Sequence, residues 1–342
     1  MSTSTREPRK PLLQRLARRR WIRARLAMLD PERDTTEIVR LSTLYGAGAL
    51  QMHWFYAVST PAAGIAPHVL DAVWREGAGD YNVRPTARKD DSVDHLLQWF
   101  EHGADAAATV KSIEIVNNYH ARHARRYPTG FDRVEDYTYI LCLNATAVDS
   151  SVRSLGLPGF DATQRRAAHL FWSRLATRFT LPDGTSVTEL ERFPDSYDAM
   201  LDYVEQYQRR PWPVHEPGHL STTAAIEHFA DTWFPRPLRF FGRALVTSFM
   251  SPHVLRAHAI DAPPTALSVV ARMSMRVMML AAERLLPDPE ESYPDRRRRL
   301  AAAGTAPASA VDVAVHRAIT SHDLDSTVQG GPHGCPHLNV LS

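Results

Sequence analysis

Residues 104–127 read "ADAAATVKSIEIVNNYHARHARRY" and predict a long amphipathic helix. Placed at 100° per residue, the apolar side chains gather on one face and the charged ones on the opposite face. The inner face comprises Val110, Ile113, Val116, Asn117, His120, Ala124 and Tyr127, and the outer face comprises Lys111, Glu114, Asn118, Arg122 and Arg125. The pattern therefore directs His120 into the protein, one helical turn after Asn117.

The rest of the chain shows the same helical periodicity, and Pro/Gly-rich turns separate the segments. Further helices are predicted at residues 91–102, 133–155, 161–179, 195–209, 220–233, 236–250 and 265–286. A short strand pair near residues 180–187 is the exception, because Asp183-Gly184 is a turn signal. We predict an all-α fold: a single large helical domain that encloses a pocket for a cofactor or hydrophobic ligand. Its expected divisions are a basic leader helix (1–30), the main domain (31–290) and a peripheral C-terminal tail (291–342).

The composition of the 342 residues is that of an ordinary globular protein with a formal net charge of +2. Two cysteines, Cys142 and Cys335, are too few for a disulfide framework, which favours a reducing, cytoplasmic compartment. No apolar segment of signal-peptide length follows the N-terminal arginines. The most membrane-like stretch, residues 44–66, is interrupted by His53 and Pro61, so we predict a buried helix there.

The N-terminus concentrates positive charge, because residues 1–25 hold nine Lys or Arg and one acid, Glu7. Leucines among these arginines predict a helix docked on the main domain. The functional alternative is a contact with anionic lipid or nucleic acid. Of these two we retain peripheral membrane contact through the basic N-terminus and expect no nucleic-acid partner.

Residues 215–219, "HEPGH", match the His-Glu-x-x-His signature of zinc metallopeptidases. The signature works only on a helix, where residues four apart share a face and can bind one metal. Pro217 and Gly218 occupy the two middle positions, and two more prolines lie just upstream. We therefore predict a proline-rich loop, which leaves a zinc hydrolase as the disfavoured alternative.

Arg88, Asp91 and Ser92 form a polar group at the start of the helix preceding that of His120. We expect Asp91 or Ser92 to cap that helix by accepting from its first backbone amides. Two helices joined by a short turn at Gly103 should pack antiparallel. The polar group then lies at the end of the hairpin that holds His120.

A buried histidine needs a partner for each ring nitrogen, and a metal is one such partner. The alternative for His120 is a neutral core histidine bonded to the backbone. His123 lies at the edge of the same face and is expected to be half exposed. A C-terminal cluster lacks an evident fourth metal ligand, so we take it as incidental; it consists of His333, Cys335 and His337.

Taken in order, these motifs resemble the oxygenase family of the mycophenolic-acid side-chain cleaving enzyme and the latex-clearing rubber oxygenases. The resemblance covers roughly residues 35–290 and rests on the order of the motifs, since each alone is weak. The matching stretches are "RKDDSV", "VNNYHARHARRY", "FDRVEDYTYILCLN", "RRAAHLFWSRL" and "FPDSYDAMLDYVEQYQRR". Their matching residues are Arg88, Asp91, Ser92, Asn117, His120, Asp136, Tyr139, Pro194 and Ser196.

The resemblance implies a haem b-dependent oxygenase in which His120 is the axial iron ligand and Asn117 contributes to cofactor binding. Arg88, Asp91 and Ser92 are then the catalytic candidates on the opposite face, and Glu76 is a further candidate base. The implied reaction uses O₂ or peroxide on an apolar, unsaturated or prenylated small molecule, by oxidative cleavage or hydroxylation. The rubber-cleaving members have lysine at the Asp91 position, so rubber is not the expected substrate. A non-catalytic helical carrier of a hydrophobic ligand is the alternative from another class.

Overall fold

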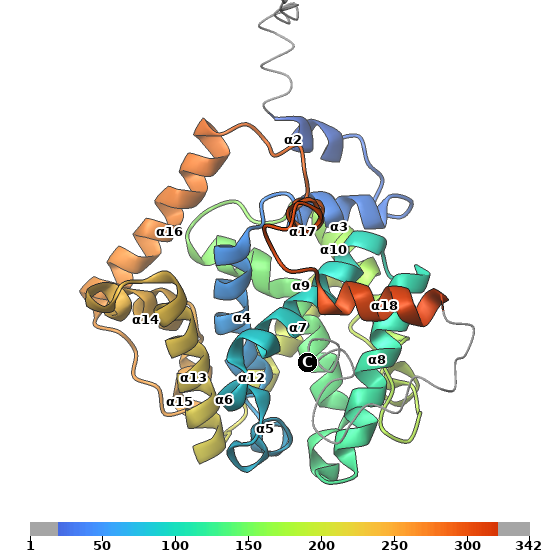
Figure 1. Ribbon diagram of the computed structural model, residues 1–342, viewed down its shortest axis with the longest axis vertical. Coiled ribbons are helices and arrows are strands. Elements are labelled where there is room, and N and C mark those ends of the chain that lie inside the picture. Colours follow the sequence, from blue (N-terminus) through green and yellow to red (C-terminus); the bar gives the residue numbers. More distant parts are fainter. Residues whose placement is uncertain (1–19, 321–342) are drawn as a thin grey trace, which may run out of the picture.

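The computed structural model describes residues 20–320, and this part of the chain is all-α (Figure 1). The helices are α2 (Trp21–Leu26), α3 (Thr35–Thr43), α4 (Ala49–Ala63), α5 (Pro67–Trp74), α6 (Asp80–Val83), α7 (Pro85–His102), α8 (Ala107–Ala124), α9 (Val134–Ser154), α10 (Ala162–Ala176), α11 (Val187–Leu190), α12 (Tyr197–Arg209), α13 (Glu216–Trp233), α14 (Arg239–Thr247), α15 (Pro252–Ala257), α16 (Thr265–Leu285), α17 (Tyr293–Ala302) and α18 (Ala310–Thr320). The expected strand pair is reduced to one isolated bridge between Thr180 and Ser186.

Helix α9 runs through the middle of the core and is buried on two faces. One face places Tyr137, Leu141 and Cys142 in a cluster with residues of α10 and α12. The other face places Tyr139 and Leu143 in a second cluster with residues of α4, α13 and α14. Burial of a large apolar side chain contributes about 1.5–3 kcal/mol, so α9 is the element on which the two halves of the core depend.

Helices α7 and α8 form the predicted hairpin. They are joined through Gly103, whose φ of +88° favours glycine. A Cβ at this position would lie 2.3 Å from Thr36 Oγ1, so a larger residue does not fit. The turn therefore fixes the helix carrying Arg88 against the helix carrying His120.

The predicted start of α7 is wrong by about two turns. The helix begins at Pro85, because proline is compatible with the first helical turn, where its missing amide hydrogen is not needed. Asp91 and Ser92 consequently lie inside the helix and do not cap it. The Ser92 hydroxyl instead donates to the carbonyl oxygen of Arg88, one turn earlier, at 3.1 Å.

The loop prediction for residues 215–219 is also wrong, since α13 begins at Glu216 with Pro217 in its first turn. The two histidines nevertheless have different partners. His215 Nε2 lies 3.2 Å from Asp71 Oδ1, and His219 Nδ1 donates to the carbonyl oxygen of His258 at 2.9 Å. Within residues 20–320, no three His, Cys, Asp or Glu side chains are grouped so that they could hold a metal ion.

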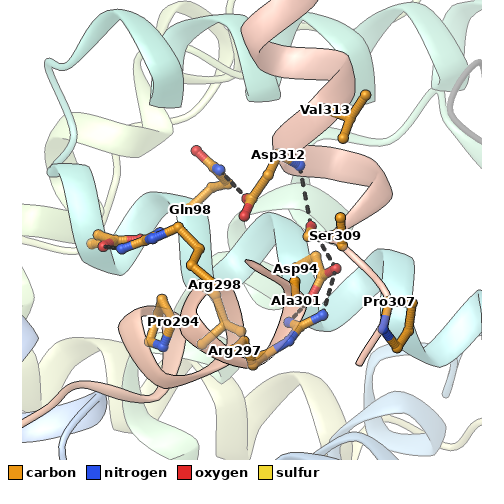
Figure 2. Close-up of a pocket in the computed structure, with 13 residues that line it drawn as sticks. Asp94, Gln98, Pro294, Arg297, Arg298, Ala301, Pro307, Ser309, Asp312 and Val313 are labelled. Carbon is orange, nitrogen blue, oxygen red and sulfur yellow. Dashed lines mark hydrogen bonds and ion pairs between the residues drawn. The ribbon is translucent and has the colours of Figure 1, made fainter. Parts of the chain in front are cut away.

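The segment expected to be a peripheral tail packs closely on the main body. Within it, α18 contacts α7 and α8, and α17 bonds α7 through Arg297 and Arg298, which donate to Asp94 and Glu101. Figure 2 shows the junction, a pocket of about 260 Å³ in which Asp94 accepts from Arg297 and Ser309. Gln98 bonds Asp312 from the same face of α7. The three-residue cluster at positions 333–337 lies outside the described residues.

The prediction of a buried helix near residues 44–66 is confirmed by α4, in which His53, Tyr56 and Ala57 are buried. A different helix is membrane-like: within residues 20–320, α16 alone is long and apolar enough to cross a bilayer. Only Ala271 is buried in α16. Helix α2 docks on the body near the end of α16, where the Trp21 indole donates to the carbonyl oxygen of Pro289 at 3.1 Å.

Candidate functional site

A cavity of about 300 Å³ lies between α4, α5, α7, α8 and α9, within the size range of small-molecule sites. Most of its wall is apolar or aromatic, contributed by residues such as Phe55, Val69, Leu70, Leu96, Val116, Phe131, Ile140 and Phe179. Polar and ionisable side chains interrupt this wall, and those that carry charge or can bind a metal are Asp80, Arg88, Asp91, His95, His120 and Asp136, with Ser92 beside them. The cavity thus gathers the predicted catalytic residues and the predicted iron ligand around one space.

One face of α7 supplies the first group. Arg88, Asp91, Ser92 and His95 follow the helical spacing of three and four residues, so all four face the cavity. His95 is buried, and its Nδ1 bonds the Ser112 hydroxyl of α8 at 2.7 Å. The residues on the back of α7 are those that bond α17 and α18. The helix is therefore held on both sides, which fixes the direction of its polar side chains.

Arg88 is a cation enclosed by protein. Its guanidinium lies 5.2 Å from the centre of the Tyr81 ring, a cation–π distance. Its Nη1 donates to the hydroxyl of Ser92. Burial opposes the charge, but Tyr81, Tyr56, Tyr119 and Asp91 together outweigh it, so the pKa of Arg88 is raised above its ordinary value. The cavity therefore keeps one permanent positive charge in an apolar wall.

His120 faces the same cavity from α8 and is held neutral. Burial, followed by the nearby positive charge of Arg88, lowers the pKa of His120 to about 4. Its ring stacks on Phe131 with the centroids 4.9 Å apart. Its Nδ1 is buried and has no hydrogen-bond partner among residues 20–320. Buried polar atoms without a hydrogen-bond partner are rare in proteins. The described residues therefore leave this ring nitrogen of His120 without a partner.

Three other residues named from the sequence lie elsewhere. Asn117 does not line the cavity, and its amide donates to the carbonyl oxygen of Arg178 at 2.9 Å. His123 is half-buried outside the wall, beside Arg75 and the Tyr119 ring. Glu76 is exposed and pairs with Arg126 at 3.6 Å. None of the three is placed to act in the cavity.

Tyr81 was missed because α6 and α7 are separate helices, so no single period relates it to Arg88. Asp136 was noted only as part of a resemblance, without a role. The structure places Asp136 in the cavity wall, with one carboxylate oxygen 2.7 Å from His68 Nε2. The hydroxyl of Tyr207 donates to its other oxygen. Asp136 is therefore a buried acid with fixed partners on α5 and α12.

The donor set in this cavity fits a cofactor that needs one nitrogen ligand from the protein. A metal held only by protein would need three or more ligands, which the cavity does not group. A neutral imidazole on a rigid helix, with an unsatisfied ring nitrogen and apolar walls around it, fits haem, which brings its own four nitrogen ligands. The fit rests on His120 alone as protein ligand.

Fold and cavity together define an all-α protein built to enclose a small molecule or cofactor. The chain matches, over residues 37–308, the family model described as "ER-bound oxygenase mpaB/B'/Rubber oxygenase, catalytic domain". This match spans most of the sequence, and the chain belongs to this family. No curated protein matches the chain at a significant level. The resemblance noted from the motifs is thereby confirmed, and the chain is a member of an oxygenase family.

Proposed function

We propose that the protein is a haem-dependent oxygenase acting on an apolar small molecule. The observation that carries the proposal is the cavity into which His120 and Arg88 converge. The apolar wall of this cavity holds both the neutral imidazole of His120, whose Nδ1 has no partner among residues 20–320, and the charged guanidinium of Arg88. A cofactor ligand, a group that binds anions and a wall that excludes water are features that a haem-dependent reaction on an apolar substrate would use. Membership in the oxygenase family supports the same reaction class.

His120 would hold the cofactor, because its low pKa keeps the ring lone pair available for iron at neutral pH. When bound, haem supplies the activation of O₂ or peroxide. Arg88 has no lone pair to give a metal, so it can act only through charge and hydrogen bonds. Its guanidinium would donate charge-assisted hydrogen bonds to an anionic group held in the cavity.

Ser92 positions Arg88 by accepting from its Nη1. Asp91, one turn from Arg88 on the cavity face of α7, is the group we propose to accept or return a proton at its carboxylate. The apolar wall excludes water and holds a hydrophobic substrate, which we propose to be unsaturated or prenylated. Cleavage and hydroxylation both remain compatible with these roles.

The test is to purify the protein after expression with added haem precursor, and to measure haem content by the pyridine haemochrome assay. Oxygen uptake is then followed with a panel of prenylated and unsaturated lipids. We expect about one haem per chain and substrate-dependent oxygen uptake. A protein that binds these lipids but takes up no haem and no oxygen would instead be a carrier. Stoichiometric zinc in place of haem would also contradict the proposal.

A further inference from the structure

A second pocket lies on the opposite side of α7 from the cavity. It is bounded by α7, α17 and α18, and its volume of about 260 Å³ is close to the 300 Å³ of the cavity (Figure 2). No residue lines both spaces. The pocket is also many times larger than the roughly 10–15 Å³ that one water molecule needs. It is therefore a separate space with room for a small organic molecule.

The wall of this pocket carries more acidic than basic groups. Its acids are Asp94, Glu101 and Asp312, and its bases are Arg297 and Arg298. Three carboxylates thus face two guanidiniums, which leaves one negative charge. Arg297 pairs with Asp94, and Arg298 pairs with Glu101. The remaining negative charge therefore belongs to Asp312.

Asp312 is a carboxylate without a counter-charge. It forms no ion pair within residues 20–320, and its side chain accepts there from the amide of Gln98. Burial raises the pKa of Asp312, an effect that the Gln98 hydrogen bond opposes and the charge of Asp94 reinforces. The nearby arginines of α17 offset the rise only in part. A cation in the pocket would stabilise the charged form of Asp312.

Gln98 provides a second acceptor that lacks a donor. Its side chain lines the pocket and is 5% exposed. A carboxylate accepts hydrogen bonds, so the Gln98 amide presents its nitrogen to Asp312. Its oxygen Oε1 is left buried, with no partner among residues 20–320, which is rare for a buried polar atom. Figure 2 shows the two side chains meeting where α7 and α18 face each other.

The donors in the wall, in contrast, are engaged. Both terminal nitrogens of Arg297 donate to Asp94, and both of Arg298 donate to Glu101. The Ser309 hydroxyl donates to Asp94 at 2.7 Å. A carboxylate or phosphate ligand would have to break these bonds to find a donor. A ligand that itself donates hydrogen bonds can leave all of them in place.

We propose that this pocket binds a small protonated primary amine with a short aliphatic body. An ammonium group has one positive charge and three hydrogens to donate, which match the unmatched acceptors of Gln98 and Asp312. The rest of the wall is apolar and suits the aliphatic body, with Leu97, Ala301, Pro307 and Val313 among its residues. A bare Mg²⁺ or Ca²⁺ ion fits less well, because it takes about six oxygen ligands or more.

Isothermal titration calorimetry of the full-length protein with n-butylamine at pH 7.5 tests the proposal. The amine is protonated at this pH, and binding is measured without haem or turnover. We expect one site per chain with a Kd on the order of 1 mM, and a higher midpoint of thermal unfolding in its presence. At the same ionic strength, 1-butanol lacks the charge and butyrate carries the opposite one. Neither should bind in this range, and neither should MgCl₂.

Two variants locate the bound amine. Asp312→Asn keeps the shape of the side chain but removes its charge, so binding should weaken at least about tenfold. Ala301→Leu keeps every charge but fills part of the pocket, and it should weaken binding to a similar extent. The matched control is Asp90→Asn, on another face of α7, whose side chain is 48% exposed. It should bind as the unchanged protein does, and circular dichroism checks that each variant is folded.

No saturable binding of n-butylamine at concentrations well above 1 mM would overturn the proposal. Unchanged affinity in either Asp312→Asn or Ala301→Leu would also contradict it, because the amine would then bind elsewhere. Equal binding of 1-butanol would show that the charge is not recognised. Saturation by MgCl₂ in the same range would identify a site for a bare cation and not for an organic amine.

Discussion

At the scale of single residues, His120 and Arg88 have different proposed roles in the cavity: His120 as cofactor ligand and Arg88 as the cation that binds anionic groups. Both face the same space, but the imidazole is neutral and the guanidinium is charged. Burial lowers the pKa of His120, whereas Tyr81 and Tyr56 help to keep the charge on Arg88. Only the neutral ring has a lone pair that could bind iron, and the guanidinium can act only through charge and hydrogen bonds.

The first prediction follows from this division. His120→Ala should abolish stoichiometric haem binding, or leave a loosely held haem with a shifted spectrum. Arg88→Ala should keep the haem and slow turnover by roughly 10²–10³, the usual loss when one positioned charge-stabilising donor is removed. The pyridine haemochrome assay and steady-state oxygen uptake separate the two effects. Full haem content with an unaltered spectrum in His120→Ala would refute the assignment, and the ligand would be sought at His95 or His123.

At the scale of elements, α7 joins the cavity to the C-terminal helices. Its front carries Arg88 and Asp91, and its back carries Asp94, which accepts from Arg297 and Ser309. Asp94 is 4% exposed. The C-terminal helices therefore contribute to the position of the catalytic candidates without touching the cavity.

Removing this contact should destabilise the fold. Asp94→Ala leaves Arg297 partly buried without its carboxylate, which should lower the free energy of unfolding by about 2 kcal/mol. The loss is smaller than for a fully buried pair, because Arg297 keeps some contact with water. Urea unfolding measures the change. The matched control is Asp90→Ala on the same helix, whose half-exposed carboxylate should contribute less than about 0.5 kcal/mol. Equal losses in the two variants would contradict a specific role for Asp94.

The start of α13 gives a second prediction at this scale. His219 donates to the carbonyl oxygen of His258 and is not grouped with other metal ligands in the described chain. His219→Ala should therefore leave metal content and oxygen uptake near those of the unchanged protein. It should lower stability by about 1 kcal/mol, the contribution of one hydrogen bond. Metal analysis by mass spectrometry decides the question, and loss of stoichiometric zinc in the variant would restore the hydrolase interpretation.

At the scale of the whole molecule, three buried or half-buried histidines make the stability of the fold depend on pH. Burial lowers the pKa of His53 to about 3, and that of His120 and His123 to about 4. The unfolded chain takes up these protons near pH 6.5, earlier than the folded protein does. Stability therefore falls as pH drops from about 6.5 towards 4, and the loss from these groups is complete below their folded values.

Thermal unfolding of the haem-free protein at pH 7.5 and pH 5 checks this prediction. We expect a lower midpoint at pH 5. His53→Gln should lose less on acidification than the unchanged protein, because glutamine takes up no proton. Other titrating groups are common to both proteins, so the difference between them isolates His53. An identical pH dependence would show that His53 is not held neutral by burial.

Local periodicity in the sequence predicted part of the fold and of the cavity. The period and the short turn at Gly103 predicted the α7–α8 hairpin, which brings Arg88 and His120 to the same cavity, because a short turn forces neighbouring helices together. It did not predict the starts of α7 and α13. Proline breaks a helix when it lies in the interior but is compatible with the first turn. The neighbouring residues do not show whether a given proline lies in the first turn or in the interior.

The sequence by itself therefore determined the all-α class, the inward direction of His120 and the family. Tertiary structure decided what each face meets. Tyr81 packs on Arg88 from a separate helix. Asn117 donates to the backbone carbonyl of Arg178 and does not line the cavity. In α16, Arg272 and Arg276 face inward because carbonyl groups of distant segments accept from them, whereas Val269, Val270 and Val277 are exposed. A period defines two faces of a helix, but only the packed chain determines which of them is covered.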